Sequence, residues 1–169
     1  MLGNWRISSV NGVVLAAYFI TAWTLVAFNI MVAPVHGLYE RPSIAVALFI
    51  SDHLNLSGMS TVRAAWLLAI GRLTVVAFFA IFLALLCIPK VRKGGGSDEA
   101  LGIALSIGSL ISLASMVMAS KVGETAALRL HATELLMLLG AAVVLVIERP
   151  ARQRVEAAAP LALDQAHAS

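Results

Sequence analysis

The sequence predicts an all-α integral membrane protein with four transmembrane helices. Of its 169 residues, 60% are hydrophobic and only 12% are charged, and the mean hydropathy is +0.93. Ordinary soluble domains are far less apolar. The apolar stretches are each long enough to cross a bilayer, which takes about 20 residues of helix. We therefore expect one domain, a four-helix transmembrane bundle over residues 1–148, with little mass outside the membrane.

The first two spans are bounded by helix-breaking residues. The first covers about residues 11–34 and ends where Pro34 and Gly37 disfavour further helix. Its apolar run is too long for the core of a secretory signal, so we expect it to remain as a span. The second covers about residues 61–88 and stops at Pro89.

Between these spans, residues 43–57 contain a short apolar run. The run is too short to cross a bilayer, so it forms either an interfacial helix or a re-entrant piece packed on the bundle. We favour a helix lying at the membrane surface, with Ser43 as its N-cap.

The last two spans form a predicted hairpin. They cover about residues 99–120 and 124–147, and the short connection between them ends in Gly123, a suitable C-cap. Pro150 is expected to end the fourth span. The alanine-rich residues 149–169 are expected to form a disordered cytoplasmic tail.

Basic residues at the span ends predict the orientation. One side holds Arg6, Lys90, Arg92, Lys93, Arg149, Arg152 and Arg154, and the other holds Arg41, Arg63, Lys121 and Arg129. The bias places both termini in the cytoplasm, with a bacterial inner membrane as the expected location. Because the basic residues are not clustered on one polar face, nucleic acid is not an expected partner. The single cysteine, Cys87, rules out an internal disulfide, and we expect it to be buried.

Ionisable residues inside the second and fourth spans are the main functional signal. They are Arg72, Arg129, His131 and Glu134, and such residues usually face a partner, a cavity or a pathway. Arg129 is close enough to its helix end to extend to the headgroups. Glu134 shares a helix face with His131 and lies roughly 12 Å deep at 1.5 Å per residue. Arg72 lies at a similar depth, so we predict that it pairs with Glu134.

Further polar residues are predicted in the same layer. The predicted intramembrane polar cluster comprises Asn29, Arg72, Ser112, His131 and Glu134. It is either a structural lock between helices or a site for a ligand or a proton. His36 and His131 could also hold a b-type haem between the first and fourth spans. We predict no metal site, because histidines one helical turn apart are absent from the sequence.

The third span carries many small residues. They are Gly102, Ser106, Gly108, Ser109, Ser112 and Ser115, a set that allows helices to approach closely. This face either packs inside the bundle or docks another subunit. Trp5, Trp23 and Trp66 are interpreted as interface anchors and lipid contacts.

These features favour a non-enzymatic protein. The sequence has no arrangement of a nucleophile and a base and no cofactor motif. The first hypothesis is an accessory or assembly subunit of a larger inner-membrane complex, in contact with lipid and with other membrane subunits or copies of itself. One alternative is an oligomeric proton-linked transporter that uses Glu134 and His131. Another is a membrane anchor that binds haem b or a quinone, although no cofactor is predicted outright.

Overall fold

The computed structural model describes the backbone of residues 7–89, 91 and 96–167, and side chains as far as Glu148. Within these ranges the chain forms helices and no β-strand. The elements are α1 (Ile7–Val32), α2 (Pro34–Leu38), α3 (Ile44–Phe49), the π-helical turn η1 (Ile50–Leu54), α4 (Gly58–Leu86), α6 (Gly96–Val122) and α7 (Thr125–His167).

In the described part of the chain, four helices are long and apolar enough to cross a membrane, which confirms the predicted fold class. They are α1, α4, α6 and the Thr125–Glu148 part of α7. The short apolar helix predicted between the first two spans is also present, as the continuous segment Ile44–Leu54.

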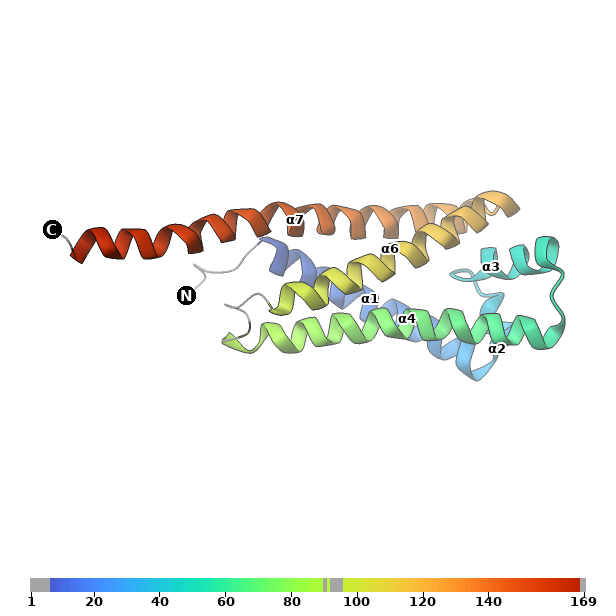
Figure 1. Cartoon of the computed structure of the whole chain (residues 1–169). Helices are drawn as coiled ribbons and strands as arrows, with labels where there is room; N and C mark the ends of the chain where they lie inside the picture. Colours follow the sequence, from blue (N-terminus) through green and yellow to red (C-terminus); the bar gives the residue numbers. More distant parts are fainter. Residues whose placement is uncertain (1–6, 90, 92–95, 168–169) are drawn as a thin grey trace.

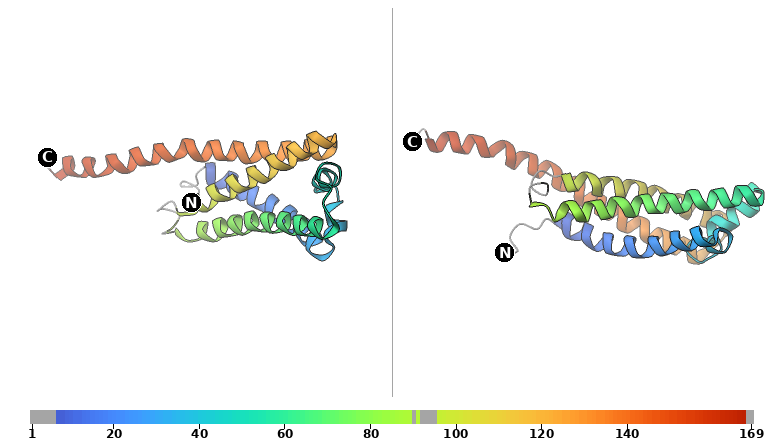
Figure 2. Two further views of the ribbon diagram at one scale, coloured as in Figure 1. Left: turned by 45° about the vertical axis from the view of Figure 1, so that its right-hand side comes forward. Right: turned by 90° about the horizontal axis from the view of Figure 1, so that it is seen from below.

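The long helices run along one axis, and α2, α3 and η1 lie together at one end, here called the α3 end (Figures 1 and 2). Helix α1 packs mainly on α4, α4 also packs on α6, and α6 forms a close hairpin with α7. Contacts between α1 and α7 are much sparser. The bundle therefore has one loosely packed seam, between α1 and α7.

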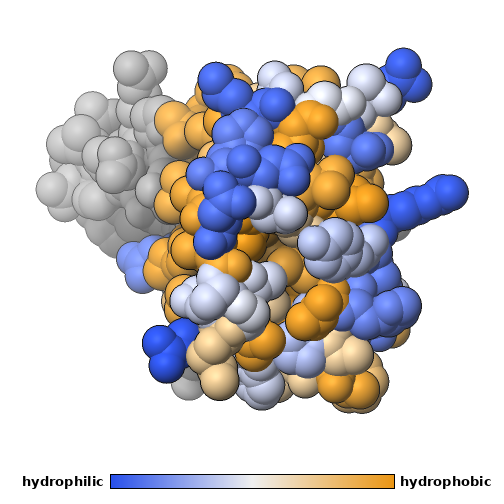
Figure 3. All heavy atoms as spheres, turned by 90° about the vertical axis from the view of Figure 1, so that its right-hand side faces the viewer, coloured by the Kyte–Doolittle hydropathy of each residue, from blue (hydrophilic) through white to orange (hydrophobic). Residues whose placement is uncertain are grey.

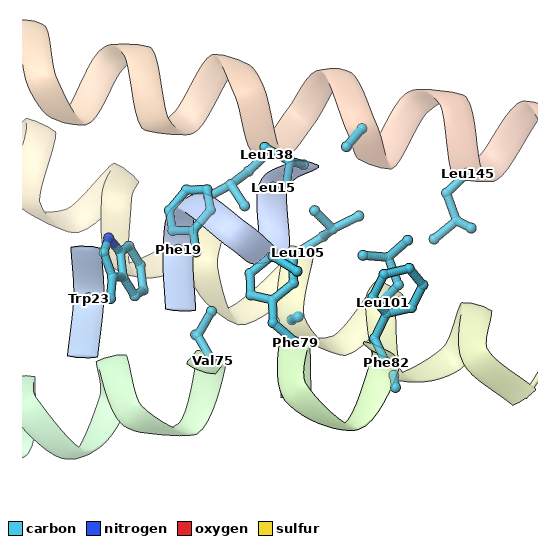
Figure 4. Close-up of a cluster of buried hydrophobic side chains, with 14 of the residues drawn as sticks. Leu15, Phe19, Trp23, Val75, Phe79, Phe82, Leu101, Leu105, Leu138 and Leu145 are labelled. Atoms are coloured by element: carbon cyan, nitrogen blue, oxygen red, sulfur yellow. The ribbon is translucent and has the colours of Figure 1, made fainter. Parts of the chain in front are cut away.

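A core of aromatic and aliphatic side chains fills the bundle (Figure 4). It includes Leu15, Phe19, Val75, Phe79, Phe82, Leu101, Leu105, Leu138 and Leu145. The rings of Phe19 and Phe79 stack with their centroids 5.6 Å apart, which joins α1 to α4. Gly108 allows α6 to approach its neighbours, because an added Cβ there would already contact Leu138 and Val75.

A polar contact closes the end of the bundle opposite α3. The backbone N–H of Ser8 donates to Glu148 Oε1 at 3.2 Å, and the Ser8 hydroxyl donates to Glu148 Oε2. The start of α1 and the end of the fourth span therefore lie at the same end of the bundle.

Helix α7 extends beyond the span, to His167. We expected Pro150 to end the helix and residues 149–169 to be disordered. The helix instead continues through Pro150, and the Glu-Ala-Ala-Ala run at residues 156–159 consists of strong helix formers. The last two positions of the predicted tail lie outside the described residues.

Helix α3 is packed into the bundle instead of lying freely on its surface. Ala45, Val46 and Ala47 are buried, and α3 contacts α6. Ser43 occupies the predicted N-cap position of α3, but its side chain makes no capping hydrogen bond. Of the two arrangements considered for this segment, the contacts match a piece packed on the bundle.

The surface of the α3 end carries many hydrophilic side chains, as Figure 3 shows. Arg41, Asp52, His53, Arg63 and Lys121 are all exposed. At the other end of α4, Cys87 is exposed, so its predicted burial is wrong. It lies just after the last helical residue, where the side chain has left the packed core.

Candidate functional site: a polar cavity between α1 and α7

Arg72 stands at the midpoint of α4 and is held by the turn that precedes α3. Its side chain is buried. Nη1 donates to Ser43 Oγ at 3.0 Å, and Nη2 donates to the carbonyl oxygen of Pro42 at 3.0 Å. Arg72 Cζ also lies 5.8 Å from the centroid of the Trp23 ring, within the range of a cation–π contact. The guanidinium thus ties α4 to α1 and to the α3 segment.

Glu134 of α7 is held by different partners. Its Oε1 accepts a hydrogen bond from Trp23 Nε1 at 3.0 Å, and its Oε2 lies 2.9 Å from His131 Nδ1. Figure 4 shows the indole nitrogen of Trp23 directed toward α7. Glu134 and His131 are three residues apart on one helix face, so this contact follows from helix geometry. The Trp23 bond crosses the loosely packed seam.

The direct ion pair predicted between Arg72 and Glu134 is not formed. Among the described residues, the guanidinium donates to Ser43 and Pro42, and the carboxylate accepts from Trp23 and pairs with His131. Trp23 contacts both charged groups, one through its ring and one through its nitrogen. The two charged side chains therefore have separate hydrogen-bond partners, and the Trp23 indole contacts both of them.

Arg72, His131 and Glu134 nevertheless line one small cavity of about 120 Å³. Its other lining residues are Tyr18, Ala22, Trp23, Val26, Pro42 and Leu130. Two buried nitrogens of these side chains, Arg72 Nε and His131 Nε2, have no hydrogen-bond partner. Buried polar atoms are rarely left unpaired, so the two nitrogens mark the cavity as a candidate binding site.

A larger pocket of about 550 Å³ lies beside this cavity at the α3 end. It is lined by Arg41, Ile44, Glu124, Ala126, Ala127 and Leu130. Leu130 belongs to both linings. Its side chain therefore stands between the polar cavity and the end of the bundle.

Two members of the predicted cluster lie elsewhere. Asn29 is exposed, and its Nδ2 donates to the Glu40 carboxylate at 3.0 and 3.3 Å. Six residues separate it from Trp23, and at about 100° per residue that places it on a different face of α1. Ser112 is buried but does not line the cavity, and its hydroxyl has no partner among the described residues.

The structure does not bring the two proposed haem ligands to one cavity. His36 is exposed on α2 and does not line the cavity that contains His131. Arg129 is exposed, as its position near a helix end predicts. Within the described residues, no group of three or more His, Cys, Asp or Glu side chains could hold a metal ion.

Trp23 is the site residue that the sequence interpretation missed. We expected a lipid contact, yet its side chain is only 3% exposed and contacts both charged groups. The signal was available, because Trp23 lies four residues after Phe19 and four before Ala27, both of them core residues. Pro42 contributes the backbone carbonyl oxygen that accepts from Arg72. No sequence pattern predicts that role.

The small residues of α6 divide between two faces. Gly108, Ser112 and Ser115 are buried inside the bundle. Gly102 and Ser106 instead line a groove of about 580 Å³ between α6 and α7, and Ser109 is half-buried. One half of the predicted packing face therefore serves the bundle itself, and the other half is presented outward.

Comparison of the chain with protein-family models, with curated proteins and with solved structures gave no match.

Proposed function

We propose that this small polytopic membrane protein is a non-enzymatic accessory subunit of a larger complex, and that a transmembrane helix of a partner docks in the groove between α6 and α7. The observation that carries the proposal is the groove itself. It lies between two membrane-spanning helices and is lined mainly by apolar side chains, including Ile103, Ile107 and Val146.

The base of the groove suits close approach of another helix. Gly102 and Ser106 are one helical turn apart on α6, and Ala142 lines the groove from α7. The Ser106 hydroxyl donates to the Gly102 carbonyl oxygen at 2.8 Å, so it needs no partner from outside. Small residues at such positions let helix backbones pack closely in a membrane. We expect the partner helix to present larger apolar side chains to this groove.

Filling the groove tests this proposal. Gly102→Leu combined with Ser106→Leu should abolish co-purification of partner chains in mild detergent, because the larger side chains occupy the docking surface. Ala80→Leu is the matched control, since Ala80 is an exposed α4 residue outside the groove. Partners retained by the double variant, or a native protein that purifies as a clean monomer, would contradict the docking proposal.

We also propose that both termini face the cytoplasm of a bacterial cell. The excess of basic residues on the terminal side supports this orientation, and the Ser8–Glu148 contact keeps α1 and the fourth span together there. In a Cys87→Ser background, Asp52→Cys should react with an impermeant maleimide added to intact spheroplasts. In the native chain, Cys87 should react only after lysis, and the reverse pattern would invert the topology. Both positions are exposed.

A further inference from the structure

The polar cavity between α1 and α7 is separate from the docking groove, and it supports an inference of its own. We propose that this cavity binds the single-ring, hydroxyl-bearing headgroup of a membrane-dissolved aromatic molecule, of the phenol or quinol class. The proposal rests on the hydrogen-bonding capacity, the net charge, the walls and the opening of the cavity.

His131 has an unused hydrogen-bond acceptor when its imidazole is neutral. Glu134 as a carboxylate can only accept hydrogen bonds, so the His131 Nδ1 that lies 2.9 Å from it carries the proton. In the neutral imidazole, Nε2 is then an acceptor. That nitrogen is buried and unpartnered, and the side chain lines the cavity. His131 can therefore accept a hydrogen bond from a ligand O–H.

Arg72 has one unused hydrogen-bond donor. Both of its Nη groups are engaged by the turn before α3, while its buried Nε–H has no partner. A hydroxyl group has both functions that the two unpartnered nitrogens require, an acceptor for the Arg72 N–H and a donor for His131 Nε2. A carbonyl oxygen could satisfy only the arginine.

The charge of the cavity favours a neutral ligand. Arg72 contributes a positive charge, and Glu134 contributes a negative one. A small anion would add a second negative charge near Glu134, at a position that lacks a second cation among the lining residues. A phenol or quinol hydroxyl brings hydrogen bonds without a net charge.

The walls of the cavity favour a ring. The indole of Trp23 and the side chains of Ala22, Val26 and Leu130 are apolar. The volume of about 120 Å³ is close to the roughly 150 Å³ of an engineered cavity that binds benzene. One ring fits such a space, and any chain attached to it must extend outside.

The opening lies within the membrane-spanning part of the bundle. Tyr18 lines the cavity from the middle of α1 and is 39% exposed, and Ala22 and Val26 are partly exposed. Because contacts between α1 and α7 are sparse overall, we expect a ligand to enter sideways from the hydrocarbon phase past these side chains. An alkyl chain on the ring would then remain in the lipid.

The test uses the full chain in lipid nanodiscs with Trp5→Phe and Trp66→Phe, so that Trp23 is the remaining one of three tryptophans. Its fluorescence reports titration with para-hexylphenol and with hexylbenzene, which has the same chain but no hydroxyl. We expect saturable binding of both, with the phenol bound roughly tenfold more tightly, as one hydrogen bond worth about 1.4 kcal/mol would give.

Variants test whether His131 accepts the hydrogen bond and whether the ligand occupies the cavity. His131→Ala should remove the roughly tenfold preference for the phenol over hexylbenzene, whereas His36→Ala, at an exposed histidine outside the cavity, should leave both affinities unchanged. Ala22→Leu should abolish binding of both ligands by filling the cavity, and it keeps the test decisive if His131→Ala does not fold. Equal affinities for the two ligands, non-saturable titrations, or unchanged binding in Ala22→Leu would overturn the proposal and leave a cavity that holds water only.

Discussion

At the scale of single residues, the main problem is how two charged side chains are kept inside a membrane-spanning bundle. An unpaired charge there would be costly. For Arg72, hydrogen bonds to the turn before α3 offset this cost. For Glu134, the contacts with His131 and Trp23 offset it. The fork of the guanidinium matters, because its two nitrogens reach two different oxygens.

Arg72→Lys should therefore destabilise the bundle although it keeps the charge. A single ammonium cannot reproduce both hydrogen bonds in the same geometry, and a lost partner in a buried site costs about 1–3 kcal/mol. Reversible unfolding in detergent micelles measures the difference. Arg63→Lys is the control, since Arg63 is exposed near the start of the same helix, and equal losses in the two variants would contradict this account.

The sequence predicts the charged members of the site and misses their partners. Ionisable residues inside apolar spans are conspicuous, which is why Arg72, His131 and Glu134 could be singled out. Trp23 was missed because tryptophan is common both at lipid interfaces and in protein cores. Asn29 was placed wrongly, because a shared depth in the membrane does not ensure a shared helix face.

At the scale of elements, the short helices of the α3 end are fixed by close backbone contact and by one polar tether. Helix α2 approaches the end of α1 so closely that a Cβ added to Gly37 would lie 2.7 Å from backbone atoms of Asn29 and Ile30. Backbone atoms cannot move away as a flexible side chain can. Glycine at this position therefore permits the turn from α1 into α2.

Gly37→Ala should lower the melting temperature in detergent clearly, because the chain must open this contact to admit a methyl group. Gly140→Ala is the matched control, since an added Cβ there meets nothing within 4 Å. In the middle of α7 it should be neutral or stabilising by up to about 1 kcal/mol. Similar melting temperatures for the two variants would show that α2 is not packed as described.

The tether of α3 makes a second prediction at this scale. Ser43→Ala removes the acceptor of Arg72 Nη1, so amide hydrogen exchange in α3 should accelerate while that of α6 stays unchanged. Ser51→Ala, at an exposed serine just after α3, should have no effect. Unchanged exchange in Ser43→Ala would mean that apolar packing alone holds the helix.

The spans themselves could be predicted from the sequence, because long apolar runs set their approximate ends. The position of α3 could not. It depends on the hydrogen bond between Arg72 and Ser43, residues 29 positions apart, and local pattern carries no information on such a contact. Ser43 occupies the N-cap position that the sequence predicts, but its hydroxyl accepts a hydrogen bond from Arg72 instead of capping the helix.

At the scale of the whole molecule, the bundle combines a well-packed side with one weak seam. Helices α1, α4, α6 and α7 share an apolar core, yet direct contacts between α1 and α7 are sparse. Glu148 binds Ser8 at one end of the seam, and Glu134 binds Trp23 farther along it. The cavity lies beside the contact between Trp23 and Glu134. The hydrogen bond that joins α1 to α7 therefore also holds two side chains of the candidate binding site.

The hydrogen bond between Trp23 and Glu134 is the central claim, and a double-mutant cycle tests it most directly. The free energy of unfolding is measured for the native chain, for Trp23→Phe, for Glu134→Leu and for the double variant. The structure predicts a coupling energy of about 1 kcal/mol or more, since the bond is buried and involves a charged acceptor. Effects that add to within about 0.5 kcal/mol would contradict the claim that this contact closes the seam.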